Sequence, residues 1–333
     1  MVNAIAVVAS NTWDAWQGAV NLSVNWTTPA NASNLSDANI QTEGLAAIYQ
    51  NLPYNPSGPN NPPTAYTPEG NYAAADQAVK SAPKRFSELY VLPYAPHNAL
   101  EPLSCTVNYV AGVSIDIYVS TQVASSVLSL AAQLTGLPLN KIHVHTTWLG
   151  GGLGRRIEVD FVSQAIQVAM AIQQPVMLLW PRPQNFVRDQ YRPVAFVQVS
   201  AGMNDSGNIV AWEIINVSPS ILAQRGFPVG ATGDSQSTEG MTGLPYNLGT
   251  ISTQWVSHPS PIPVGFWRSV GMSINTFAVE SAIDELAVMA GVDPLQFRLN
   301  MCTDPRWAGV LNAVASLCNW SAGPPSGLSL IHI

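Results

Sequence analysis

The residues best suited to chemistry in this chain form a glycine-rich run, Gly150-Gly151-Gly152-Leu153-Gly154-Arg155-Arg156. Glycine adopts left-handed backbone conformations without strain and lets a ligand approach the chain closely. The run follows a predicted strand and precedes a predicted helix, so unpaired N–H groups and a helix dipole would face the same ligand. Its glycine spacing matches neither the dinucleotide fingerprint nor the P-loop. The run therefore predicts an anion-binding loop, with a tight strand-to-helix turn packed around glycines as the alternative.

Two histidine patterns are further candidates. His143 and His145 lie on one face of a predicted strand, a spacing that allows a pair of metal ligands. Histidines that are buried or hydrogen-bonded within the protein are commoner than histidine metal ligands, and we predict no metal ligand in this chain. His97 and Glu101 are one helical turn apart just before Pro102, where an imidazole and a carboxylate can orient each other or a ligand. A structural cap is an equally good interpretation of this pair.

Arg268 is an isolated cation in the segment 263–271, between aromatic residues and glycines. A guanidinium in such a position can bind an anionic group through its planar fork, or it can pair with a surface acid. No Ser or Cys lies beside a base in a recognisable pattern, so the sequence does not favour a hydrolase.

Composition excludes several classes of protein. The chain has 333 residues, of which 47% are hydrophobic and 10% charged, with a net charge of −7. A chain of this size can bury a large core, but it lacks the dense basic face that nucleic acid binding requires. Cys105, Cys302 and Cys318 are too scattered for a zinc or iron–sulfur site, so any such cluster must lie on another chain. No apolar run reaches the roughly 18 residues of a membrane span.

The elements that must position these residues are mixed helices and strands. Apolar alternation predicts strands over 1–8, 22–26, 114–119, 141–147 and 176–180, and two more strands around a turn at 204–207. Helical spacing predicts helices around Trp13, Trp16 and Ala19, over 123–135 with Gly136 as C-cap, over 157–173, over 275–290, and after Asp293. Between Pro29 and Pro83 the chain is rich in Asn and Pro and predicts a long connector with short helical pieces. The fold class is therefore α+β.

An ordered set of motifs is more specific than any one of them. Along the chain it comprises His97-x-x-x-Glu101-Pro102, Ser120-Thr121-Gln122, the run 150–156 with Asp160, Asp189-Gln190-Tyr191-Arg192-Pro193, Gly265-Phe266-Trp267-Arg268-Ser269-Val270-Gly271, and 280–287 with Asp293-Pro294. This set resembles the large, molybdenum-binding subunit of the xanthine oxidase family, and within it the isoquinoline 1-oxidoreductase beta-subunit type. The resemblance implies the end of an α/β hammerhead-like domain (1–30), a Pro/Asn-rich connector (31–85), a first molybdopterin-binding mixed α+β domain (86–318) and an unmatched tail (319–333).

The resemblance also implies a cofactor and a reaction. The cofactor would be molybdopterin with molybdenum, in the cytosine dinucleotide form common in bacterial relatives. The reaction would hydroxylate an aromatic N-heterocycle or an aldehyde with oxygen from water and pass electrons to a small partner subunit holding [2Fe-2S] clusters. Gln122 is similar to the Gln near the oxo side of the metal, and Arg268 to the Arg that contacts the pterin region. The loop beside the metal and its pterin is matched by Gly151, Gly152, Leu153 and Gly154, with Leu153 where many relatives have Phe.

The sequence also departs from a complete subunit. The glutamate that acts as base in the family belongs to a second cofactor-binding half, which we expect beyond the C-terminus, so no catalytic residue is predicted here. If the base does lie in this chain, Glu101, Glu158 and Glu239 are the first candidates. The rival interpretations are a catalytically silent binding or assembly module of the same fold and a nicotinamide or flavin oxidoreductase, which the glycine spacing disfavours. Bacterial cytoplasm and periplasm both stay open as locations.

Overall fold

The computed structural model describes residues 4–28, 32, 35–50 and 65–320. The chain divides into two compact units, each assembled from separate segments. Unit 1 contains Met1–Ile40, Tyr94–Pro193 and Pro261–Arg268. Unit 2 contains Gln41–Pro93, Val194–Ser260 and Ser269–Ile333. The chain therefore leaves and re-enters each unit.

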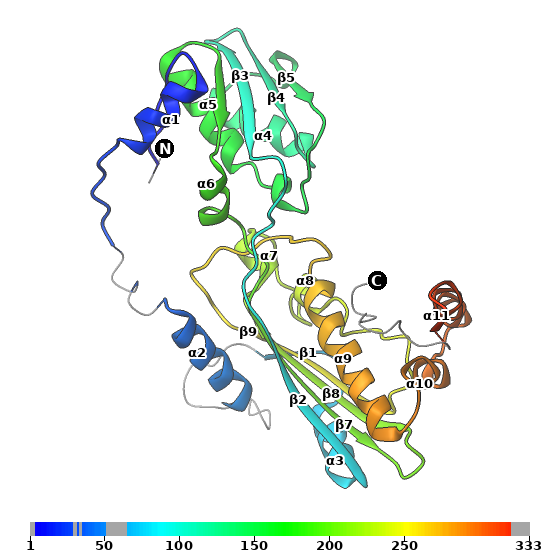
Figure 1. Ribbon diagram of the computed structural model, residues 1–333. Coiled ribbons are helices and arrows are strands. Elements are labelled where there is room, and N and C mark those ends of the chain that lie inside the picture. The colour runs from blue at the N-terminus through cyan, green and yellow to red at the C-terminus, as the bar shows by residue number, and fades with distance from the viewer. Residues whose placement is uncertain (1–3, 29–31, 33–34, 51–64, 321–333) are drawn as a thin grey trace. The chain divides into compact units, whose positions relative to one another are not determined.

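Unit 1 is built on a four-stranded sheet with the strand order β5-β4-β3-β6 (Figure 1). Strand β3 is antiparallel to β4 and β6, and β4 is parallel to β5. The elements of this unit are α1 (Thr12–Val20), β3 (Ser104–Val110), β4 (Ser114–Val119), α4 (Ala124–Thr135), β5 (Ile142–Thr146), α5 (Asp160–Ile172), β6 (Val176–Leu179), α6 (Arg182–Val187) and the short 3-10 turns η2 (Leu139–Lys141) and η3 (Arg155–Ile157).

The core of unit 1 lies between this sheet and the helices α4 and α5. Alternate strand residues such as Val107 and Ile117 are fully buried and pack with Val127 of α4 and Phe161 of α5. Helix α4 ends at Gly136, whose φ of 70° is left-handed, as the sequence predicts. This packing fixes the strand ends from which the glycine-rich run departs.

Unit 2 is built on a five-stranded sheet with the order β1-β9-β8-β7-β2, in which only the pair β8 and β9 is parallel among the described strands. Its elements are α2 (Asp37–Gln50, which begins in unit 1), β1 (Ala65–Gly70), α3 (Tyr72–Ser81), β2 (Lys84–Leu92), β7 (Ala195–Met203), β8 (Ile209–Ser218), α7 (Ile221–Gln224), α8 (Ser235–Thr238), β9 (Thr250–Ser257), α9 (Met272–Ala290), α10 (Pro294–Met301) and α11 (Pro305–Leu317).

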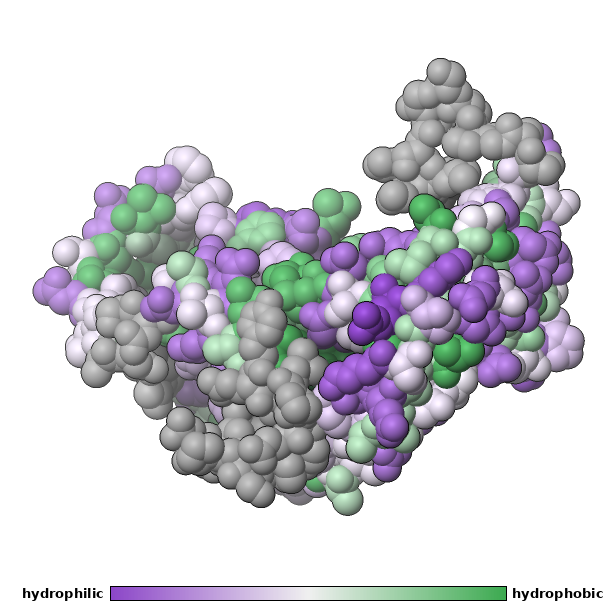
Figure 2. Space-filling model, turned by 90° about the horizontal axis from the view of Figure 1, so that it is seen from below, coloured by the Kyte–Doolittle hydropathy of each residue, from purple (hydrophilic) through white to green (hydrophobic). Residues whose placement is uncertain are grey.

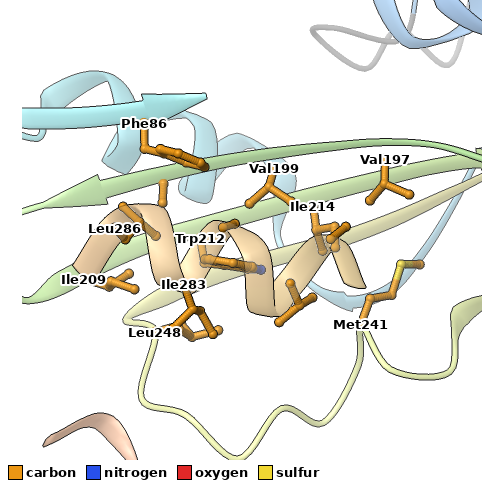
Figure 3. Close-up of a cluster of buried hydrophobic side chains, with 14 of the residues drawn as sticks. Phe86, Val197, Val199, Ile209, Trp212, Ile214, Met241, Leu248, Ile283 and Leu286 are labelled. Atoms are coloured by element: carbon orange, nitrogen blue, oxygen red, sulfur yellow. The ribbon is translucent and has the colours of Figure 1, made fainter. Parts of the chain in front are cut away.

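Helix α9 lies along one face of the unit 2 sheet (Figure 1). In Figure 3, Val199, Trp212 and Ile214 belong to the buried cluster that packs against Ile283 and Leu286 of this helix. Because side chains alternate along a strand, the residues between these apolar positions lie on the opposite face, which α3 covers.

The predicted α+β class is confirmed, and so are the helices at 124–135, 272–290 and 294–301. The predicted N-terminal strands are wrong for the described residues, because 4–8 and 22–26 form no β-pairing. Helix α1 is present, but Trp13 is 64% exposed and Trp16 is 50% exposed, so the predicted inner face is not buried. Among the described residues, no helix combines the length and apolarity of a membrane span.

The Asn- and Pro-rich stretch contains more regular structure than a connector. It includes α2 and α3, and also β1, a strand that we did not predict because its sequence contains Pro68 and Gly70. Strand β1 lies at the sheet edge, where a proline is tolerated because no second neighbour needs its N–H group. The centre of the stretch, 55–63, and most of the tail, 321–333, lie outside the described residues. The domain boundaries at 30, 85 and 318 stay predictions.

Candidate cofactor-binding site

The glycine-rich run follows β5 in unit 1 and adopts an irregular backbone. Gly151, Leu153 and Gly154 have φ angles of 97°, 54° and 103°. A positive φ costs glycine little, but it is uncommon for leucine and strains its backbone. Such strain gathers at ligand-binding sites, and here the surrounding contacts must hold it.

Three consecutive backbone N–H groups of this loop are free to bind a ligand. The N–H groups on either side are used, because Gly150 donates to Glu101 Oε2 at 2.7 Å and Gly154 donates to Gln122 Oε1 at 3.1 Å. The N–H groups of Gly151, Gly152 and Leu153 donate to no other described residue. Successive free N–H groups on a turn with left-handed residues make a concave donor surface for an anion or an acceptor-rich ligand.

The Arg156 side chain supports this loop through hydrogen bonds and an ion pair. The side chain is fully buried; Nε donates to the Gly151 carbonyl at 2.9 Å, and one terminal nitrogen donates to Ser120 Oγ at 2.7 Å. The other terminal nitrogen is 3.0 Å from Glu101 Oε2. Burial lowers the pKa of Arg156, and the charge of Glu101 opposes that shift. The buried guanidinium at the end of the loop, through the Gly151 carbonyl and the partly exposed Glu101 carboxylate, therefore fixes the start of the loop.

A buried pair, His97 and Asp189, lies against the other side of the loop. His97 Nδ1 is 2.8 Å from Asp189 Oδ1, and the His97 backbone N–H donates to Asp189 Oδ2 at 2.6 Å. Arg155 also forms an ion pair with this carboxylate, with Nε 3.2 Å from Asp189 Oδ1. Burial raises the pKa of Asp189, but the hydrogen bonds from His97 and Gln190 outweigh burial and leave that pKa below its ordinary value. The ionised carboxylate therefore orients the imidazole.

The residues just before Arg268, Phe266 and Trp267, pack against the glycine-rich loop and the segment that carries His97. His97 Nε2 is 3.4 Å from the Phe266 carbonyl oxygen, and a Cβ added to Gly154 would overlap that oxygen. The Trp267 indole donates to the Pro96 carbonyl at 3.0 Å. Arg268 follows directly; its side chain is exposed and makes no hydrogen bond or ion pair with any other described residue.

The structure thus brings Gln122 and the loop residues 151–154 together and sets the backbone before Arg268 beside them. It does not pair His97 with Glu101, since each has a different partner. It also corrects the expected helix N-terminus at the loop: the turn η3 separates the loop from α5, and Asp160 in the first turn of α5 pairs with Arg155. The unpaired N–H groups of the loop, and not a helix N-terminus, are therefore the backbone donors available here.

His143 and His145 lie on the exposed face of β5, and both rings contact Asp116 Oδ1, at 3.2 and 2.9 Å. Asp116 lies on the neighbouring strand β4, which is why sequence spacing alone did not find it. Within the described residues, no group of three or more His, Cys, Asp or Glu side chains is arranged to hold a metal ion.

Sequence reasoning missed the roles of Arg156 and Asp189. Both residues are inside the motifs that carry the family resemblance, but their partners are far away in the chain; Asp189 and His97 are 92 positions apart. One feature of the sequence could have indicated them: only 10% of the residues are charged, yet Arg155 and Arg156 are adjacent. In such a chain, adjacent arginines indicate buried ion pairs.

A comparison with protein families matches residues 57–301 to the molybdopterin cofactor-binding domain. Among curated proteins, a nicotinate dehydrogenase chain of Pseudomonas putida is 28% identical over 257 residues, covering 74% of this chain and 21% of that protein. The beta chain of isoquinoline 1-oxidoreductase from Brevundimonas diminuta is 27% identical over 267 residues, covering 78% of this chain and 33% of that protein. The chain spans about a fifth to a third of these relatives.

Solved structures agree on the fold. Quinoline 2-oxidoreductase from Pseudomonas putida 86 has a TM-score of 0.66 at 16% identity, over 78% of this chain and 35% of that chain. Aldehyde oxidoreductase from Desulfovibrio gigas has a TM-score of 0.65 at 18% identity, over 85% of this chain and 33% of that chain. The resemblance to molybdenum-binding large subunits is thereby confirmed, and the chain belongs to the family of molybdopterin cofactor-binding domains.

Proposed function

We propose that residues 151–154, with Gln122 and Arg268, form part of the site for a molybdopterin cofactor in its cytosine dinucleotide form. The observation that carries this proposal is the row of free N–H groups at Gly151, Gly152 and Leu153, on a loop whose shape a buried arginine maintains. A molybdopterin presents oxo, sulfur and phosphate acceptors, which such donors fit. A turn with a purely structural role does not need three consecutive backbone N–H groups without hydrogen-bond partners.

Each predicted residue has a distinct part in holding the group. Gln122 Oε1 accepts a hydrogen bond from the Gly154 N–H. The Gln122 amide nitrogen donates to no other described residue, so it can donate to the ligand. Gly152 is buried, and a Cβ there would lie 2.5 Å from Gln122 Oε1, so the backbone can approach a ligand only with glycine at this position. Arg268 offers an exposed fork to an anionic group.

We further propose that the complete protein hydroxylates an aromatic N-heterocycle or an aldehyde and passes electrons to a small [2Fe-2S] subunit. When bound, the cofactor supplies the two-electron redox chemistry. The residues of this chain bind and orient the cofactor. The names of relatives that act on nicotinate, isoquinoline and aldehydes support this substrate class. The base is expected in a part of the protein outside this chain.

The experiment is the substitution Gly152→Val in the complete protein co-expressed with its partner subunit. The added side chain should meet Gln122 and fill the space next to the free N–H groups, so molybdenum and cytosine nucleotide content should fall while the far-ultraviolet circular dichroism stays unchanged. Gly309→Val in α11 is the matched control, because a Cβ there meets nothing within 4 Å. A folded Gly152→Val protein with full cofactor content would remove the loop from the site.

The chain of 333 residues expressed alone should carry no stoichiometric molybdenum, because the rest of the cofactor shell is expected elsewhere. Two large apolar side chains are exposed near the loop: Trp148 (99%) precedes it in sequence, and Leu100 (87%) has its backbone beside Gly151. Figure 2 shows hydrophobic residues at the surface among hydrophilic ones. The isolated chain should therefore aggregate or bind a hydrophobic dye. A monodisperse chain with stoichiometric metal and dye-reducing turnover would direct mutagenesis to Glu101, Glu158 and Glu239 as the base.

A further inference from the structure

A second site lies in unit 2, between α3 and the face of the sheet that α9 does not cover. A cavity of about 360 Å³ is present there, within the range of small-molecule sites. Its polar lining consists of Tyr72, Asp76 and Lys80 from α3, Arg85 and Ser87 from β2, Ser200 from β7 and Glu213 from β8. None of these residues belongs to the glycine-rich loop or its supports, so this cavity is independent of the proposed cofactor site.

Glu213 is the unusual member of this lining. It is only 4% exposed, and its carboxylate makes no hydrogen bond or ion pair with any other described residue. Burial raises the pKa of Glu213 to about 7; the nearby charge of Asp76 adds to the shift and that of Lys80 opposes it. Lys80 is paired with Asp76 at 2.8 Å, so it does not neutralise Glu213 by contact. A buried carboxylate without a partner is costly, which makes it a strong acceptor for an incoming cation.

Hydroxyl oxygens flank Glu213 on both neighbouring strands. Ser200 lies opposite Glu213 on β7, and Ser252 lies opposite it on β9, so all three share one face of the sheet. Ser87 Oγ is 3.2 Å from Ser200 Oγ and already accepts from Gln198 Nε2 at 3.0 Å. Ser252 Oγ is buried and has no hydrogen-bond partner among the described residues. The cavity lining therefore presents the Glu213 carboxylate and the hydroxyls of Ser87 and Ser200, while Ser252 is not one of the lining residues.

We propose that this cavity binds a small primary ammonium compound, with the Glu213 carboxylate as counter-ion and the Ser200 and Ser87 hydroxyls as further acceptors. A primary ammonium group has three N–H donors, which these three oxygen groups can satisfy. The remaining lining includes the apolar Val79 from α3, which suits the carbon skeleton of an amine; Phe86 also lines the cavity, but its side chain belongs to the buried cluster on the α9 face of the sheet (Figure 3).

Other ligand classes fit less well. A divalent metal ion requires more anionic ligands than the single unpaired carboxylate, and the described residues contain no group of three metal-competent side chains. An anion would be repelled by Glu213 at the floor. Arg85 is exposed and lines the cavity from β2, so a ligand with a second positive charge is disfavoured there.

Binding should depend on pH through Glu213. The charged and titratable groups facing it are Asp76, Lys80 and Tyr72 from α3 and Arg85 from β2, while β7 and β9 contribute only uncharged serines. Because the ligand needs the ionised carboxylate, its affinity should rise as the pH passes upward through the Glu213 pKa of about 7.

The test is isothermal titration of the full protein at about pH 8, above the raised pKa of Glu213, with n-propylammonium. Tetramethylammonium and 1-propanol serve as probes that lack either N–H donors or charge, and we expect heat of binding for n-propylammonium alone. Glu213→Gln should weaken that binding by about tenfold or more, the loss expected for one charge-assisted hydrogen bond. Glu88→Gln, which changes an exposed carboxylate of β2 that does not line the cavity, should bind as the wild type does.

Three results would overturn the proposal. One is the absence of n-propylammonium binding at millimolar concentration, which would show that the cavity is not an ammonium site. Another is equal binding of tetramethylammonium, which would indicate an unspecific surface cation. The third is unchanged affinity in a folded Glu213→Gln protein, with folding checked by circular dichroism. None of these readouts depends on molybdenum, so they are separate from the test of the cofactor site.

Discussion

Gly154 is the position where the packing of the candidate site can be tested most sharply. Its φ of 103° is left-handed, and a Cβ there would overlap the Phe266 carbonyl oxygen and lie 3.0 Å from His97 Nε2. In Gly154→Ala, the segment before Arg268 must therefore move away from the loop by about 2 Å to restore an ordinary contact distance.

The cost has two parts that a control variant separates. A left-handed alanine costs about 1 to 2 kcal/mol. Displacing Phe266 also breaks its contact with His97 at 3.4 Å and strains the hydrogen bond from Trp267 to Pro96 at 3.0 Å, for about 1 kcal/mol each. Gly136→Ala carries the first cost alone, because Gly136 has a φ of 70° and an added Cβ meets nothing within 4 Å. We expect Gly154→Ala to lose about 3 to 4 kcal/mol, and Gly136→Ala about 1 to 2 kcal/mol.

Urea unfolding of the two variants and the wild type measures both losses. In the complete protein, cofactor content should fall in Gly154→Ala and stay at the wild-type level in Gly136→Ala. Equal losses of stability would show that Phe266 does not pack against Gly154. Full cofactor content in a destabilised Gly154→Ala protein would show that this contact does not shape the binding loop.

Three further substitutions test separate parts of the structure. Arg268→Ala should weaken cofactor retention by about 1 to 3 kcal/mol with Lys rescuing only partly, and unchanged molybdenum content on dialysis would assign Arg268 to the solvent surface. Arg156→Met should lower the free energy of unfolding by about 3 kcal/mol or more, because it leaves the buried side of Glu101 and the Gly151 carbonyl without their partner; a loss under about 1 kcal/mol in urea titration would contradict this. Folding raises the pKa of Glu213 from 4.5 to about 7, so ionisation destabilises the folded protein increasingly between these pH values. Glu213→Gln should therefore be more stable than wild type by up to about 3 kcal/mol at about pH 8 and by little at about pH 4, whereas a difference that does not vary with pH would disprove the shift.

Elements governed by local periodicity could be predicted from the sequence. Helix α4 and its Gly136 cap, and helix α9 with Gly291 after it, follow from apolar spacing and one glycine each, which are properties of neighbouring residues. The same local signals failed in two places. Strand β1 contains a proline and is set by pairing with β9, and residues 4–8 have strand-like composition but find no partner strand among the described residues.

The site was predictable in part for the same reason. The loop 150–156 is a local pattern, so its glycines, together with Gln122 and Arg268 from the ordered motifs, could be named from sequence. The partners that hold the loop are long-range: His97 meets Asp189, and Arg156 meets Glu101, 55 positions away in the chain. No spacing rule in one sequence reports such contacts. Glu213 has no motif at all, and only its burial without a partner distinguishes it.

The most direct test of the central claim is a measurement of metal and nucleotide in the complete wild-type protein. The protein that contains this chain would be purified with its partner subunit, its molybdenum determined by mass spectrometry, and its cytosine nucleotide determined after acid hydrolysis. We predict equimolar molybdenum and cytosine nucleotide per chain. A folded, monodisperse complex that contains neither metal nor pterin, even when expressed in cells that make the cofactor, would contradict the account and identify the chain as a catalytically silent module of the same fold.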